Sequence, residues 1–341
     1  ESDEAAPKAM LNAYLRRGVE GFSAAQSQQF RNTLSTTAGS EGGYTVPSLI
    51  SGTLFDYMKA FGAMRAVAEV IRTSDGKPLS FPTSDGTSEV GELIAQNTTA
   101  TAADPTFGTV ALNVYKYSSK IVAAPYELLQ DSTIDVEGFI LRRLAQRLGR
   151  IGNQHFTTGT GAGQPNGLIT AATVGKTGTT GQTTTIIFDD LVDVIHSVDP
   201  AYRTASRCSF MTNDSLLKVI RKLKDSQNRP LWVPSFERGI VTGVGTEGGY
   251  ASQDQAVFFD QLLGYPVYVN NDIATPAANA VTLSFGDHSF YKVRDAMEVQ
   301  LFRFTDSAYT KLGQVGFLAW CRMGGNLVDT NAVKTYKHSA T

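Results

Sequence analysis

The feature that most constrains the fold is one long amphipathic helix, predicted at residues 135–156. Apolar or aromatic side chains recur there at steps of four, four, four, three and four residues, which places them on one helical face. Residues that commonly cap helices precede this stretch, and its length of roughly 30 Å suits a structural spine. The apolar stripe consists of Val136, Ile140, Leu144, Leu148, Ile151 and His155, and Arg143, Arg147 and Arg150 follow one edge of it.

Strand-like segments flank this helix in the sequence. Residues 79–82 and 109–115 have strand character, and a long polar stretch rich in Ser, Thr, Ala and Asp separates them. Because so long a loop is uncommon inside a compact domain, we predict an extended hairpin that projects from the body. Residues 1–45 are polar and rich in small side chains, which indicates an arm whose structure depends on another chain.

After the helix, helices and strands alternate. Residues 159–181 are rich in Gly and Thr and are predicted to be turns. Helices are predicted at 188–198 and 213–224, a strand at 207–212, and long strands within 297–322. The pattern indicates an α+β protein.

Composition narrows the classes of function. The formal net charge is −2, whereas proteins that bind nucleic acid tightly usually carry an excess of basic residues, so tight nucleic-acid binding is disfavoured. The two cysteines, Cys208 and Cys321, are far apart and lie in apolar stretches, which indicates buried free thiols. No apolar run approaches the ~20 residues that cross a bilayer, so no membrane contact is expected.

The sequence offers no credible catalytic, cofactor or metal site. The four histidines are scattered and show no metal-ligand spacing. The glycine-rich residues 159–163 follow a helix and lack the Lys-Ser/Thr pair of a phosphate loop. Asp189 and Asp190 are explained by a helix N-terminus. A structural protein is favoured, and an enzyme with a dispersed active site stays as an alternative.

Seven short passages in the same order resemble the major capsid proteins of tailed bacteriophages with the Hong Kong 97-type fold. Together they span about residues 40–330. They are Gly-Gly-Tyr-Thr-Val-Pro at 42–47, Phe-Gly-Thr-Val-Ala-Leu at 107–112, Ala-Pro-Tyr-Glu-Leu-Leu-Gln-Asp-Ser at 124–132, the Gly-Thr-Gly-Ala-Gly-Gln-Pro-Asn-Gly turn within 156–167, Leu-Lys-Asp-Ser-Gln-Asn-Arg-Pro-Leu at 223–231, Leu-Leu-Gly-Tyr-Pro-Val at 262–267 and Ser-Phe-Gly-Asp at 284–287.

The resemblance implies how the chain is divided. It implies an arm at 1–45, an extended hairpin loop at 78–118, a peripheral domain carrying the spine helix 135–156, and an axial domain. The peripheral domain is expected to combine residues 46–77, 119–185 and 293–320, and the axial domain residues 186–292 and 321–341.

The resemblance also implies a function and partners. Copies of the chain would form hexamers and pentamers that close an icosahedral shell in the virion, after assembly in the bacterial host cytoplasm. Implied partners are a portal protein, a scaffold and a protease during assembly, a decoration (cement) protein, and packaged double-stranded DNA held by weak non-specific contact. The sequence begins at Glu1 without a methionine, and many family members lose an N-terminal scaffolding segment to a protease. A numbering choice explains the same observation.

Three groups of residues are expected at contacts between subunits. The hairpin would bury apolar residues on a neighbour, the arginines of the spine helix would pair with carboxylates or merely solvate the helix, and the segment 224–232 would lie near a symmetry axis. The residues concerned are Val90, Leu93, Ile94, Arg143, Arg147, Arg150, Lys224, Asp225, Arg229 and Trp232.

One departure from the family pattern predicts a chemical difference. Some members join subunits by an isopeptide bond between a hairpin lysine and an asparagine. Residues 79–115 contain no lysine, and residues 311–323 contain no Asn, Asp or Glu. We therefore expect no covalent cross-linking by this route, so mature particles should give a single-subunit band on a denaturing gel. A ladder of multimers would contradict this.

Two further alternatives share parts of this pattern. An encapsulin-like nanocompartment shares the fold and would enclose an enzyme cargo instead of DNA. A tail protein is disfavoured because helices and strands alternate around one long helix, whereas a tail tube is β-rich.

Overall fold

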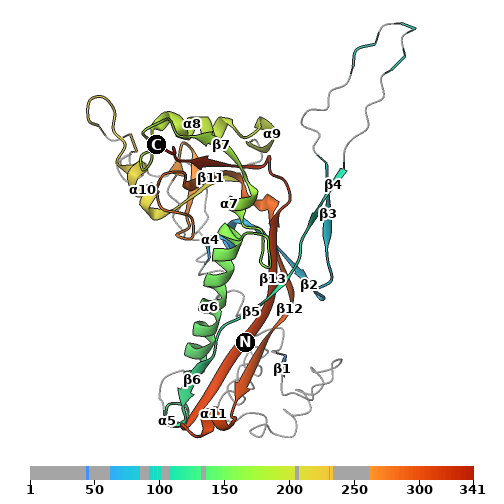
Figure 1. Ribbon diagram of the computed structural model, residues 1–341, viewed down its shortest axis with the longest axis vertical. Coiled ribbons are helices and arrows are strands. Elements are labelled where there is room, and N and C mark those ends of the chain that lie inside the picture. The colour runs from blue at the N-terminus through green and yellow to red at the C-terminus, as the bar shows by residue number, and fades with distance from the viewer. Residues whose placement is uncertain are drawn as a thin grey trace, which may run out of the picture.

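The computed structural model describes residues 44–45, 62–84, 92–94, 96–97, 99–100, 107–131, 136–203, 207–229, 231–232 and 261–341. Within these residues the fold contains two six-stranded sheets and a separate two-stranded hairpin. Figure 1 shows an elongated lower part, built on long strands and one long helix, beneath a more compact upper part. The α+β prediction is confirmed.

Two 14-residue strands form the centre of the first sheet. β12 (Tyr291–Phe304) and β13 (Gln314–Leu327) pair antiparallel along most of their length. Their outer edges each carry two shorter strands in succession, so the sheet is widened along its whole length. These are β2 (Glu69–Thr73) and β1 (Tyr44–Thr45) on β12, and β5 (Tyr115–Ser118) and β6 (Val122–Pro125) on β13.

The long helix α6 (Val136–Thr158) packs against this sheet and begins and ends within two residues of the prediction. Val136, Ile140, Leu144 and Leu148 are buried in one core with side chains of β12 and β13, which confirms the apolar stripe. Short helices lie at both ends of this unit. They are α4 (Ala63–Val67), α5 (Tyr126–Asp131), α7 (Leu168–Ala171) and α11 (Ser307–Thr310).

The second sheet has its own core. Its strand order is β7-β14-β11-β8-β10-β9, and its central strand β11 (Val281–Asp287) is buried along almost its whole length. Helices α8 (Phe188–His196) and α10 (Asp214–Arg221) contribute apolar faces to this core, and the Asn213 side chain caps the N-terminus of α10. The other elements are β7 (Thr173–Thr177), β8 (Cys208–Thr212), β9 (Gln261–Leu262), β10 (Tyr265–Val269), β14 (Val333–Lys337), α9 (Pro200–Arg203) and the 3-10 turn η4 (His288–Phe290).

One predicted feature is wrong. Residues 159–181 were predicted to be turns, but they contain α7 and β7, and β7 pairs in parallel with β14. β7 contains the strand-favouring residues Thr and Val, but the glycines within and around it favour turns. Pairing with a strand more than 150 residues later in the chain supplies the order that local sequence does not indicate.

A buried polar seam joins α6 to the second sheet. The Asn153 side-chain amide donates to Asn270 Oδ1 at 2.8 Å and also to Asp272. The Asn270 amide donates to Thr157 Oγ1 at 2.8 Å, and Asn153 Oδ1 accepts from the Met64 backbone. Because buried polar groups are costly unless paired, this closed set of bonds favours one placement of the helix on the sheet.

The two sheets are also connected by the chain itself. β13 runs through residue 320, where a domain boundary was predicted, without interruption, and the chain then enters the second sheet as β14. The division into arm, hairpin, peripheral and axial parts stays a prediction.

His288 is a buried neutral histidine of the second sheet. Both ring nitrogens lie within hydrogen-bond distance of serine hydroxyls, Ser209 at 2.8 Å and Ser284 at 3.0 Å. Burial lowers the pKa of His288 to about 4, and the Asp287 carboxylate offsets only part of this.

This histidine predicts a loss of stability in acid. Between pH 6.5 and 4 the unfolded chain binds a proton at this residue and the folded chain does not, so stability falls as the pH falls. At about 1.4 kcal/mol per pH unit the loss is about 3 kcal/mol. Urea unfolding of the wild type and of His288→Gln across this range checks this, and the total losses of stability should differ by that amount. Equal losses in the two proteins would contradict the assignment.

Candidate assembly surfaces

The projecting hairpin is built from β3 (Ser80–Ser84) and β4 (Phe107–Ala111), which pair antiparallel as predicted. Neither strand joins either large sheet, and Figure 1 shows them leaving the body on the side away from α6. Leu93 is fully exposed and Ile94 is 41% exposed, whereas Val90 lies outside the described residues. An isolated subunit leaves these apolar side chains in water, which is typical of a contact surface.

The exposed face of α6 is basic. Arg143 and Arg150 are exposed, as is Arg147, and the helix contains four arginines and one acidic residue, Glu137. Arg143 donates to Gln146 and lies over the Phe139 ring, with its guanidinium carbon 5.4 Å from the ring centroid. Among the described residues no ion pair joins any of these arginines to a carboxylate of the same subunit.

Arg147 has a different role from its neighbours. Its Nη1 atom donates to the backbone carbonyls of Ser119 and Ile121 at 3.4 and 3.3 Å. These residues flank Lys120, whose φ of 57° marks the break between β5 and β6. Arg147 therefore binds the helix to the edge of its own sheet.

The segment 224–232, which was predicted to contact another subunit, is stabilised by hydrogen bonds within itself. Asp225 accepts hydrogen bonds from the backbone N–H groups of Gln227 and Arg229. It also forms an ion pair with the Arg229 side chain, whose Nε atom lies 2.9 Å from Asp225 Oδ2. These bonds lower the pKa of Asp225. Lys224 is exposed. Trp232 is half-buried against the second core, and the Arg221 guanidinium carbon lies 5.5 Å from its ring centroid.

Sequence reasoning missed two features. Exposed apolar side chains gather around the distal end of the first sheet, near α5, α11 and the start of α6; they are Ile121, Leu128, Phe139 and Leu312. The second is Arg294, a buried arginine beneath the hairpin. Spacing gave no signal for either, because their neighbours come from distant parts of the chain.

Within the described residues no three His, Cys, Asp or Glu side chains are placed to hold a metal ion. Cys208 and Cys321 are buried free thiols, as predicted, and burial raises their pKa values to about 11 and 12, which keeps them protonated. None of the described helices is long and apolar enough to cross a membrane.

One cavity of about 410 Å³ opens between the hairpin base and the glycine-rich turn. Asn113, Asn166 and Asn326 line it together with residues 160–162. The Asn166 side-chain amide donates to Asn326 Oδ1, and the Asn326 amide donates to the Ala111 carbonyl. These two side chains therefore already have hydrogen-bond partners within the protein.

Comparisons with known proteins agree with this architecture. The model of the family described as "Phage capsid family" matches residues 42–338. A solved structure described as the capsid of a native GTA particle is similar with a TM-score of 0.65 and 23% identity, over 94% of this chain and 99% of that chain. The capsid of an empty GTA particle gives a TM-score of 0.62 and 25% identity over 82% and 90%. A structure from Microbacterium phage Oxtober96 gives 0.53 and 16% over 82% and 91%.

Comparison with curated proteins gives no match. The family match nevertheless covers most of the chain, and the fold, with its spine helix, long central strands and projecting hairpin, is that of the matched capsid structures. The chain therefore belongs to the phage capsid family, as a major capsid protein.

Proposed function

We propose that copies of this chain form pentamers and hexamers that close an icosahedral shell around the genome of a tailed bacteriophage. The observation that carries this is the hairpin, which projects from the body with exposed apolar side chains and joins neither sheet. A contact that one subunit makes with the next in a head-to-tail sense generates rings, and rings of five and six close a shell. The subunit acts by assembly and not by catalysis.

The charges of the hairpin and of α6 are complementary. Residues 85–106 contain four acidic residues, Asp85, Glu89, Glu92 and Asp104, and no Lys, Arg or His. The exposed face of α6 carries the arginines described above. Eleven residues of extended chain reach about 36 Å, and a 23-residue helix is about 34 Å long. The hairpin of one copy therefore has the length and the charge to lie along the helix face of another.

The remaining partners follow from this role. We infer that a portal protein, a scaffold and a protease act during assembly in the host cytoplasm, and that packaged double-stranded DNA makes weak non-specific contact with the inner wall. Since we expect no isopeptide cross-linking, a decoration protein or the area of the interfaces supplies the stability of the shell. Individual contacts are weak, and their number makes the shell stable.

Negative-stain electron microscopy combined with sedimentation tests the proposal. The purified protein should give uniform icosahedral shells, and particles from its source should contain DNA. Small shells filled with a protein cargo would assign the chain to a nanocompartment. A discrete species of a few subunits, with no shells under any condition, would contradict the proposal.

A further inference from the structure

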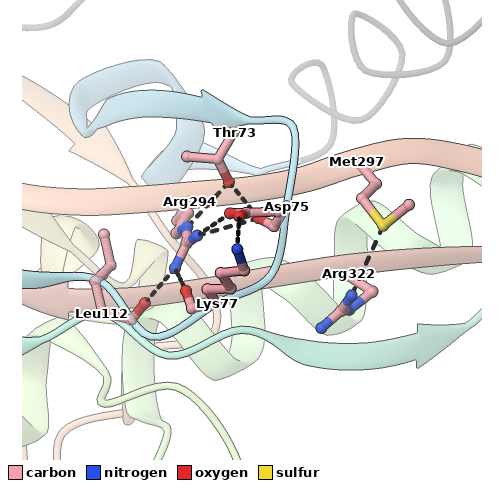
Figure 2. A network of polar contacts seen from close by, with 7 residues as sticks. All are labelled: Thr73, Asp75, Lys77, Leu112, Arg294, Met297 and Arg322. Carbon is pink, nitrogen blue, oxygen red and sulfur yellow. Dashed lines mark hydrogen bonds and ion pairs between the residues drawn. The ribbon is translucent and has the colours of Figure 1, made fainter.

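Arg294 lies in β12 beneath the base of the hairpin and is 2% exposed. Its guanidinium donates four hydrogen bonds, to Thr73 Oγ1 at 3.0 Å and to the carbonyls of Lys77, Leu112 and Asp75 at 2.7, 3.1 and 3.1 Å. Figure 2 shows the side chain surrounded by these acceptors. A buried guanidinium is stable only when its donors are satisfied, and three of the four acceptors here are backbone carbonyls.

These acceptors belong to both chains of the hairpin. Thr73, Asp75 and Lys77 lie on the segment that leads from β2 into β3, and Leu112 follows β4 directly. One side chain therefore binds the outgoing and the returning chain at once. A planar guanidinium with five donors can do this, whereas a lysine ammonium has three donors on one atom and cannot reach acceptors spread over both chains.

A second arginine holds the same turn from the side. Arg322 of β13 packs so close to Gly76 that a Cβ added there would lie 2.2 Å from its Nη2 atom. Its Nη1 atom lies 3.7 Å from the sulfur of Met297, a residue with a φ of 62° in the bulge of β12. The Asp75 carboxylate lies 3.6 Å from Arg294, so the turn 74–77 is fixed on two sides.

The joint matters because few other contacts orient the hairpin, one of them the hydrogen bond of 3.1 Å from Asn326 of β13 to the Ala111 carbonyl. β3 and β4 pair with each other and with no other strand, and Leu79 and Leu112 close the base through one backbone hydrogen bond of 2.7 Å. Eleven residues, half of the 22 between β3 and β4, span up to about 36 Å when fully extended, so a tilt of about 10° at the base moves the far end of such a chain by up to about 6 Å. That exceeds the spacing of about 4.8 Å between paired strands, so a contact with a neighbour would be lost.

We propose that Arg294 is a positioning residue for assembly: it fixes the direction in which the hairpin leaves the body, so that the hairpin docks on a second copy of the chain. This inference rests on the proposed capsid function. It predicts that loss of the joint separates folding from assembly, because the two sheet cores contain none of the hairpin strands.

The test compares wild type with Arg294→Lys, with the milder Thr73→Val, and with Glu69→Gln as a control. Glu69 forms an exposed ion pair with Lys292 two residues from Arg294. Shell formation is followed by sedimentation, and hydrogen exchange of unassembled subunits by mass spectrometry. In Arg294→Lys the hydrogen-exchange rate of the hairpin strands, residues 80–84 and 107–111, should rise about tenfold. The exchange rate of residues 208–212 and 281–287 in the second sheet should not change. Shell yield should fall at least tenfold. Thr73→Val should show the same pattern to a smaller degree, and Glu69→Gln neither change.

Three outcomes would overturn the proposal. Unchanged exchange in the hairpin strands would show that Arg294 does not order them. Normal shell yield despite faster exchange would show that their direction does not matter. Faster exchange in both sheets of both variants would show an ordinary structural role. If the wild type itself forms no shells, the proposed function fails instead, while the exchange data still decide whether Arg294 orders the hairpin.

Discussion

Replacing Asp295 with alanine is expected to lower the free energy of unfolding by about 3–5 kcal/mol, because it leaves a buried charge without its partner. Arg65 and Asp295 are both almost completely buried and form two parallel bonds, Nη1 to Oδ2 at 2.8 Å and Nη2 to Oδ1 at 2.7 Å. Burial alone would lower the pKa of Arg65, and the hydrogen bond and charge of Asp295 more than offset this, so the pKa is raised. Arginine is not deprotonated in proteins, so the guanidinium stays charged in the variant although Asp295 is gone.

The measurement is urea unfolding of unassembled subunits near neutral pH, with Glu69→Gln as the matched control. Glu69 of β2 and Lys292 of β12 form an exposed pair, and exposed pairs contribute about 0–1 kcal/mol. The double variant Arg65→Met with Asp295→Leu should recover much of the loss, since well-packed apolar groups replace buried ion pairs at little cost. A loss below about 1 kcal/mol in Asp295→Ala would show that the pair is not buried in solution.

The second large effect is expected on assembly. Reversing Arg143 and Arg150 to glutamate should raise the protein concentration needed for shells at least tenfold, which corresponds to about 1.4 kcal/mol. Each reversal replaces an attraction to the acidic hairpin of a neighbour with a repulsion, and exposed pairs contribute about 0.2–1 kcal/mol each. The subunit should still fold, because both side chains are exposed and lie off the apolar stripe.

Compensation makes this experiment specific. Adding Glu89→Arg and Glu92→Arg to the reversed helix should restore shell formation, since every copy then carries both changes. Lys218→Glu in α10 with Lys222→Glu at its C-cap alters the net charge by the same amount and controls for general repulsion. If the helix face contacts DNA instead, the reversal would leave empty shells unaffected and lower only the DNA content of particles, with no rescue from the hairpin.

The sequence predicted those parts of the fold that local periodicity encodes. The apolar stripe from Val136 to Leu148 repeats with the period of a helix, and its burial follows directly from that pattern. β3 and β4 were predicted because strand-like segments flank a polar stretch too long for a compact loop. The contact residues proposed on both elements stay predictions, because a single chain does not show what covers them.

Arg294 could not have been predicted in this way. A charged residue within a strand normally indicates a solvent-facing position, and its partners precede it by 182 to 221 residues. Only the crossing of β2, the hairpin base and β12 brings them together. The same reason explains β7, because no local pattern indicates its pairing with β14.

The position of β13 and β14 has a consequence for synthesis. β13 is central in the first sheet and β14 lies between β7 and β11 in the second, so residues 314–337 complete both cores. A ribosome adds about 5–20 residues per second, and until this late stretch has emerged neither sheet can close. We therefore expect a nascent chain to fold, and to bind other subunits, only after residues 314–337 have been synthesised. A product that terminates before residue 314 lacks β13 and β14 and should not be incorporated into a shell.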